Sequence, residues 1–103
     1  MMIKRFTPVF LSLFLLLTAC ATAPVQEMSD ARQAIKAAEV AGAREYAAEA
    51  FAEALQLLDD ADYLISQRRF EVARVVARRA KTISIQARRA ALNARQQQGD
   101  TTQ

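Results

Sequence analysis

Residues 43–66 read AREYAAEAFAEALQLLDDADYLIS, a stretch without Pro or Gly in which apolar residues recur at alternating spacings of four and three. This spacing is typical of a helix that packs along one face against another helix, in a seam of the coiled-coil type. We therefore predict an α-helix over about 43–66. Its seam positions are Ala47, Phe51, Ala54, Leu58, Ala61 and Ile65.

A second periodic segment follows after the short polar gap Ser66–Arg69 and extends over about 70–97. A shorter helix over about 29–41 precedes the first segment, and Gly42 either ends that helix or kinks it. A short turn between long helices makes them antiparallel neighbours. We predict an all-α fold, an Ala-rich antiparallel helical hairpin preceded by a shorter helix, with 27–98 as the helical domain and 99–103 as a disordered tail. The packing positions of the second segment are Phe70, Ala73, Val76, Ala77, Ala80, Ile83, Ala87, Ala91 and Ala94, with Ala90 beside them.

The charges of the two halves of this domain are opposite. Residues 27–62 carry nine acidic and three basic side chains, and residues 63–103 carry nine basic and two acidic ones. Folding back at 67–69 lays the acidic helix beside the basic one. Exposed ion pairs stabilise a fold by only about 0–1 kcal/mol each. They therefore determine which helices pair more than they stabilise the pair.

The first twenty residues have the pattern of a targeting signal. Lys4 and Arg5 precede the apolar run 6–17, which is shorter than the roughly 20 residues of a membrane span. A cationic start, a short apolar run and small residues at the end are typical of a secretory signal. We predict a signal peptide over 1–19, cleaved between Ala19 and Cys20.

The end of that signal, Leu17-Thr18-Ala19-Cys20, resembles the lipobox of bacterial lipoproteins. The resemblance implies that the Cys20 sulfur carries a diacylglycerol, a covalent lipid, and that its amino group is acylated after cleavage. Two or more acyl chains anchor a protein stably to a membrane. In similar lipoproteins an Asp after the Cys retains the protein in the inner membrane. Ala21 stands there, which implies the outer membrane, on its periplasmic face, with residues 20–26 as the lipidated tether.

The helical domain resembles the family called domain of unknown function 4398, over roughly 24–95. The resemblance rests on Ala41-Gly42-Ala43, on Glu45-Tyr46-Ala47, on the phrase from Ala54 to Ala61, and on Phe70-Glu71-Val72-Ala73-Arg74 with the alanines that follow. Members of the family are short lipoproteins of the bacterial envelope. Many of them have Pro shortly after the Tyr-Ala phrase, whereas this chain has Ala48, which predicts a more continuous helix.

Several classes of function find no support in the composition. The chain has no His, which removes His-based catalysis and His-ligated metal sites, and its single Cys removes any intramolecular disulfide. The acidic cluster Asp59-Asp60-Asp62 is predicted to pair with Arg68, Arg69 or Arg74 across the turn, not to hold a cation. We predict no enzyme activity, no cofactor other than the lipid on Cys20, no small-molecule substrate, and no nucleic acid as partner.

A stripe of basic residues at helical spacing is the candidate partner-binding surface, with a solvated face paired to the acidic helix as the simpler interpretation. We predict a non-catalytic structural or adaptor module that acts through helix–helix contacts with an envelope protein or with itself. The alternatives are a self-associating spacer, a partner-binding module like a tetratricopeptide unit, and a module that binds anionic lipid or lipopolysaccharide. The basic stripe comprises Arg74, Arg78, Lys81, Arg88 and Arg95.

Overall fold

The computed structural model describes residues 22–101, and this part of the chain contains helices and no strands. The signal, its cleavage position at Ala19 and the lipidation position Cys20 lie outside the described residues. The helices are α2 (Val25–Val40), α3 (Ala43–Tyr46), α4 (Ala48–Ser66) and α5 (Phe70–Thr101). The predicted all-α fold is confirmed.

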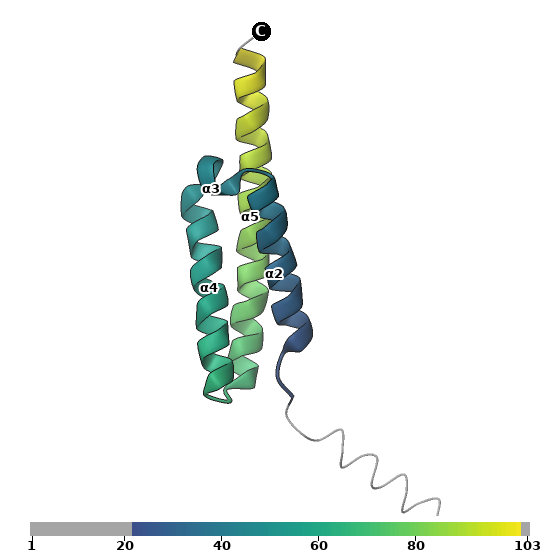
Figure 1. Ribbon diagram of the computed structural model, residues 1–103, viewed down its shortest axis with the longest axis vertical. Coiled ribbons are helices and arrows are strands. Elements are labelled where there is room, and N and C mark those ends of the chain that lie inside the picture. Colours follow the sequence, from purple (N-terminus) through teal and green to yellow (C-terminus); the bar gives the residue numbers. More distant parts are fainter. Residues whose placement is uncertain (1–21, 102–103) are drawn as a thin grey trace, which may run out of the picture.

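The helices α4 and α5 form the predicted antiparallel hairpin, and α2 lies along α5 in the parallel direction (Figure 1). Both α2 and α4 pack on α5, so the short first helix is part of the same bundle as the hairpin. At its C-terminal end α5 extends beyond its neighbours (Figure 1).

The turn between α4 and α5 closes with a Schellman arrangement at the end of α4. The Arg69 N–H donates to the Leu64 carbonyl at 2.9 Å, and the Arg68 N–H donates to the Ile65 carbonyl at 2.9 Å. Arg68 takes the left-handed conformation that this motif requires, with φ 59°. The polar gap therefore makes the turn that the sequence predicts.

The core is built largely from alanines that are fully excluded from solvent. Ala77 and Ala80 on α5, Ala54 and Ala61 on α4, and Ala38 on α2 all have no exposed surface. Because an alanine side chain is a single methyl group, the helices that meet through these residues can approach closely and gain dispersion contacts along their length.

The first helix begins earlier than predicted. Pro24 stands at its N-cap position, is fully buried, and accepts a hydrogen bond from the Met28 N–H at 3.0 Å. Proline suits a helix start because it has no N–H to leave unpaired there. The prediction that the helix starts near Ser29 is therefore wrong by about one turn, and Val25 and Gln26 of the predicted tether are helical.

The question that the sequence left open at Gly42 has a clear answer: α2 ends there. Gly42 has φ 92°, in the left-handed region. A Cβ at this position would lie 3.1 Å from Cδ2 of Tyr46, so both the backbone and the space favour glycine.

The prediction of an uninterrupted helix over 43–66 is wrong, because the chain breaks at Ala47, with φ −145° and ψ 50°. The break separates the single turn α3 from α4. It leaves Ala43 buried, and the Tyr46 hydroxyl donates a hydrogen bond to Oε1 of Gln98 at 3.0 Å. Tertiary contacts with α5 thus accompany a bend that local helix propensity does not predict.

The predicted disordered tail is also corrected, since α5 continues through Gly99 to Thr101. Inside a helix a glycine is less favourable than alanine by only about 1 kcal/mol, so Gly99 does not end the helix.

Candidate functional site

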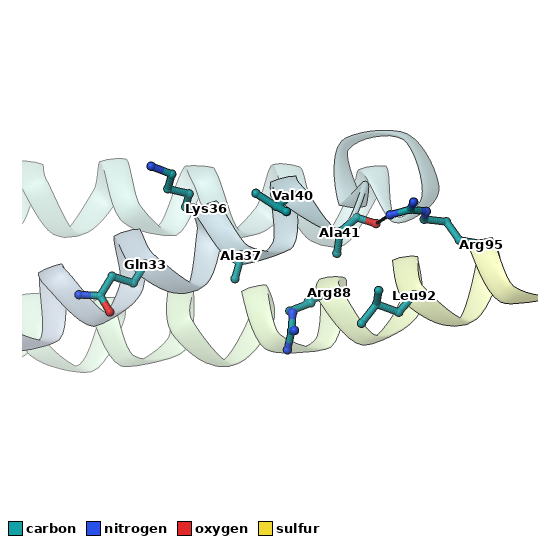
Figure 2. Close-up of a pocket in the computed structure, with 8 residues that line it drawn as sticks. All are labelled: Gln33, Lys36, Ala37, Val40, Ala41, Arg88, Leu92 and Arg95. Atoms are coloured by element: carbon teal, nitrogen blue, oxygen red, sulfur yellow. Dashed lines mark hydrogen bonds between the residues drawn. The ribbon is translucent and has the colours of Figure 1, made fainter.

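An open and largely apolar hollow of the described chain lies between α2 and α5, near the C-terminal end of α2. We call it the α2–α5 groove (Figure 2). It encloses about 540 Å³, and the side chains of Ala37 and Ala41 point across it toward α5. Its lining residues are Gln33, Lys36, Ala37, Val40, Ala41, Arg88, Leu92 and Arg95.

The groove combines apolar and cationic side chains. Val40 is 77% exposed and Leu92 is 43% exposed, and both line the groove. Exposed apolar residues that lie together, rimmed by polar ones, are typical of an interaction site. Lys36 and Arg88 are exposed and form no ion pair with any residue of 22–101. The groove therefore offers apolar contact together with uncompensated positive charge.

One cation of the groove has a structural role. Nη1 of Arg95 donates a hydrogen bond to the Ala41 carbonyl at 3.1 Å, at the end of α2 (Figure 2). The last carbonyls of a helix have no hydrogen-bond donor within it and carry partial negative charge. A guanidinium both donates the missing hydrogen bond and places a positive charge there.

A second hollow of about 450 Å³ continues the groove toward the start of α2. Here Glu27 and Asp30 face Arg78 and Lys81, so the charges are balanced. Glu27 lies 3.6 Å from Nη2 of Arg78. Only the half of the interface around Arg88 and Leu92 is both cationic and apolar.

Arg74 belongs to the structure of the bundle and is not a free member of the basic stripe. Its Nε donates to Oε1 of Glu27 at 3.2 Å, its Nη1 donates to Glu71, and its Nη2 donates to the Thr22 carbonyl at 3.3 Å. The hydrogen bond with Glu71, aided by the charges of Glu71 and Glu27, raises the pKa of Arg74 above its ordinary value. Through its contacts with Glu27 and the Thr22 carbonyl, Arg74 ties α2 and the residues before it to α5.

The five residues of the predicted basic stripe thus separate into different environments. Arg74 and Arg95 hold α2, and Arg78 lies near Glu27. Lys81 and Arg88 are exposed and have no ion pair within the described chain.

The acidic cluster pairs differently from the prediction. Oδ1 of Asp62 lies 3.3 Å from Nη2 of Arg32 on α2, and Asp60 accepts a hydrogen bond from Gln56 at 3.0 Å. The predicted pairing of this cluster with Arg68, Arg69 or Arg74 is wrong, because α2 lies beside the turn and supplies the partner of Asp62, while Gln56 of α4 itself supplies that of Asp60. No group of His, Cys, Asp or Glu within 22–101 is arranged to hold a metal ion.

Most of the predicted packing residues lie in or against the core. Those with at most 2% exposure are Phe51, Ala54, Ala61, Ala73, Ala77, Ala80, Ala87 and Ala91. Those that are half-buried and packed against the core are Ala47, Leu58, Ile65, Val76 and Ile83. Phe70 is half-buried at the start of α5 and belongs to neither cluster of core residues, and Ala90 is exposed.

Sequence reasoning missed Ser84, which is fully buried on α5. Its hydroxyl donates to the Ala80 carbonyl at 2.7 Å and so needs no other partner. Ser84 completes the seam Ala73, Ala77, Ala80, Ser84, Ala87 and Ala91 at spacings of four and three. The gap between Ala80 and Ala87 in the apolar pattern was the signal that could have found it.

The structure thus defines a small all-α domain that packs through alanines and leaves a long groove beside its central helix. Within 22–101, no helix is both long enough and apolar enough to cross a membrane. The family model described as domain of unknown function (DUF4398) matches residues 26–102, which covers the bundle except for Val25, and the chain belongs to that family. No curated protein and no solved structure matches the chain significantly.

Proposed function

We propose that this protein is a lipoprotein anchored in the outer membrane through Cys20, with its helical domain in the periplasm. The support is the sequence Leu17-Thr18-Ala19-Cys20 at the end of an apolar signal, followed by Ala21. Two or more acyl chains on Cys20 would hold the domain stably at the bilayer surface.

We propose further that the helical domain is a non-catalytic structural or adaptor module that acts through helix–helix contacts. The observation that carries this proposal is the α2–α5 groove, where Val40 and Leu92 are exposed beside Lys36 and Arg88. A helix rises about 1.5 Å per residue, so the groove stands roughly 20 Å along α2 from its start near the anchor. A bundle that stood upright on its tether would hold the groove at about that height above the bilayer, within reach of a protein partner.

The anchor is tested by fatty-acid labelling and membrane fractionation of three forms of the full chain. Wild type should be labelled and recovered with the outer membrane. Cys20→Ala should give an unlabelled precursor that keeps its signal peptide. Ala21→Asp is the matched control for sorting: it should keep the label but move the protein to the inner membrane. Normal cleavage and outer-membrane recovery of Cys20→Ala would refute the anchor.

The adaptor role is tested by site-specific crosslinking in cells. A photoreactive residue at Leu92, in the groove, should capture one defined envelope protein. The same residue at Ala52, exposed on α4 away from the groove, should not capture it. Identical products from both positions would show that the groove is not the contact surface.

A further inference from the structure

The two walls of the α2–α5 groove carry side chains at the spacing that packs helices. Along α5 the groove is lined at alternating spacings of four and three, and α2 repeats that alternation on the opposite wall. Two parallel ridges with this spacing form the groove into which the ridge of a further helix fits. The residues at these spacings, taken from the groove and from the second hollow that continues it, are Lys81, Ile85, Arg88, Leu92 and Arg95 on α5, with Asp30, Gln33, Ala37 and Val40 on α2. The other lining residues of the two hollows are Gln26, Glu27, Lys36, Ala41, Arg78 and Thr82.

The charge of the groove follows the same repeat. Lys81, Arg88 and Arg95 are seven residues apart along α5, which places one cation about every 10.5 Å. Ile85 and Leu92 lie between them. In coiled coils, the charges that flank the apolar seam pair with opposite charges of the partner helix and so choose it. Arg95 already bonds the Ala41 carbonyl, whereas Lys81 and Arg88 have no ion pair within 22–101. The groove therefore calls for two acidic residues seven positions apart, one opposite Arg88 and one opposite Lys81.

The arrangement of the cations disfavours a single compact anion, such as a lipid head group. Lys36 points away from α5, Arg88 points away from α2, and Arg95 reaches toward the Ala41 carbonyl (Figure 2). These side chains do not converge on one point. They fit charges that are distributed along an elongated ligand.

A second copy of the chain could offer an acidic helix, its α4, but that helix lacks the exposed aliphatic side chains that would cover the groove. The outer face of α4 carries Glu49, Glu53 and Asp60. The exposed apolar residues of that helix are Ala48, Ala52 and Tyr63, so it lacks branched aliphatic side chains to cover Val40 and Leu92. The groove fits a different helix better.

We propose that the α2–α5 groove binds an acidic amphipathic α-helix of a partner protein, which lies along α2 and α5 as the fourth helix of the bundle. The inference rests on the proposed role of this domain in helix–helix contacts and names the chemistry of the partner. Aliphatic residues of the bound helix cover Ala37, Val40 and Leu92, and its carboxylates face Lys81 and Arg88.

The test uses the full chain in lipid nanodiscs and two synthetic, fluorescently labelled helical peptides of three heptads. Both peptides have Leu and Ala along one face. One has Glu beside that face, and the other has Lys at the same positions. By fluorescence anisotropy the Glu peptide should bind at least about tenfold more tightly than the Lys peptide.

Variants of α5 locate the binding. Arg88→Glu should weaken binding of the Glu peptide by about tenfold and strengthen that of the Lys peptide. Leu92→Glu should weaken both. Arg89→Glu makes the same charge change on the neighbouring residue, which does not line the groove, and should leave both affinities within about twofold. Circular dichroism of each variant establishes that the helices are intact.

Three results would overturn the proposal: equal affinity for the two peptides, no effect of Arg88→Glu, or displacement of the Glu peptide by anionic phospholipid vesicles. Sedimentation of the chain alone gives a fourth, since self-association abolished by Arg88→Glu would assign the groove to a second copy. Lipid labelling and crosslinking from Leu92 do not depend on these peptides. A failed peptide test beside a successful crosslink would refute the acidic helix and leave the adaptor role standing.

Discussion

Arg95 on α5 donates a hydrogen bond from Nη1 to the carbonyl of Ala41, 54 residues earlier in the chain, at 3.1 Å. Ala41 is the last residue before Gly42 turns the chain out of α2 with φ 92°. The contact therefore joins the C-terminal end of the short helix to the long one. At the other end of α2, Arg74 holds Glu27 and the Thr22 carbonyl. Two arginines of α5 thus fix the two ends of α2.

Removing the Arg95 side chain should loosen the end of α2. We expect Arg95→Ala to lower the free energy of unfolding by about 1 kcal/mol, from the lost charged hydrogen bond and the lost favourable charge at a helix C-terminus. Urea unfolding of the full chain, followed by circular dichroism, measures this change. Arg89→Ala removes an equal charge from an exposed position, and a loss as large as that of Arg95→Ala would contradict a specific role for the Ala41 contact.

The turn at Gly42 should tolerate no side chain. Gly42→Ala puts a Cβ where the backbone is left-handed and 3.1 Å from Cδ2 of Tyr46. We expect the free energy of unfolding to fall by about 1–2 kcal/mol, since a left-handed conformation costs an L-residue that much. Thermal unfolding of the variant measures the loss.

Gly99 offers the matched control for that substitution. A Cβ there meets nothing within 4 Å, and the residue lies inside α5. Gly99→Ala should therefore raise the stability, by at most about 1 kcal/mol, because alanine favours the helix. Effects of the same sign from the two alanine substitutions would contradict this account of Gly42.

The hairpin could be predicted because one pattern determines it. The seam from Phe51 to Ile65 and the alanines from Ala73 onward both repeat at helical spacing, and only a turn's length of polar residues separates them. Such a repeat can be recognised from the sequence alone, because it marks the buried face of each helix whatever that face packs against. The fold class and most buried positions followed from it.

The errors have tertiary causes. The break at Ala47 accompanies the contact of Tyr46 with Gln98, which is remote in sequence. The partner of Asp62 is Arg32, because α2 packs beside the hairpin, and the sequence pattern did not place α2. The α2–α5 groove was missed for the same reason. Its cations on α5 were found, but Lys36 and the apolar lining depend on how α2 aligns with α5, and the sequence does not reveal that alignment.

The small size of the seam residues can be tested at Ser84. Ser84→Ala should leave the stability unchanged or raise it by up to about 0.5 kcal/mol, because alanine is the better helix former and the Ala80 carbonyl keeps its backbone hydrogen bond. Ser84→Leu should lower the stability by about 1–3 kcal/mol, because the added atoms must separate closely packed helices. The control Ala90→Leu adds a large side chain at an exposed position of α5 and should change stability by no more than about 0.5 kcal/mol. Equal effects of the two leucines would argue against close packing at the seam.

Phe51 and Phe70 were both predicted to fix the hairpin, and the structure now ranks them. Phe51 is 2% exposed within a core made mainly of alanines, and Cζ of Arg44 lies 4.8 Å from the centre of its ring. Few other large side chains could fill the space that Phe51→Ala would leave, so we expect a loss of about 3–5 kcal/mol. Phe70→Ala should cost less than about 2 kcal/mol, because Phe70 is half-buried and lies outside the core clusters. Urea unfolding of both variants measures the two losses, and a larger loss from Phe70→Ala would place the centre of the fold at the α4–α5 turn instead of beside α3.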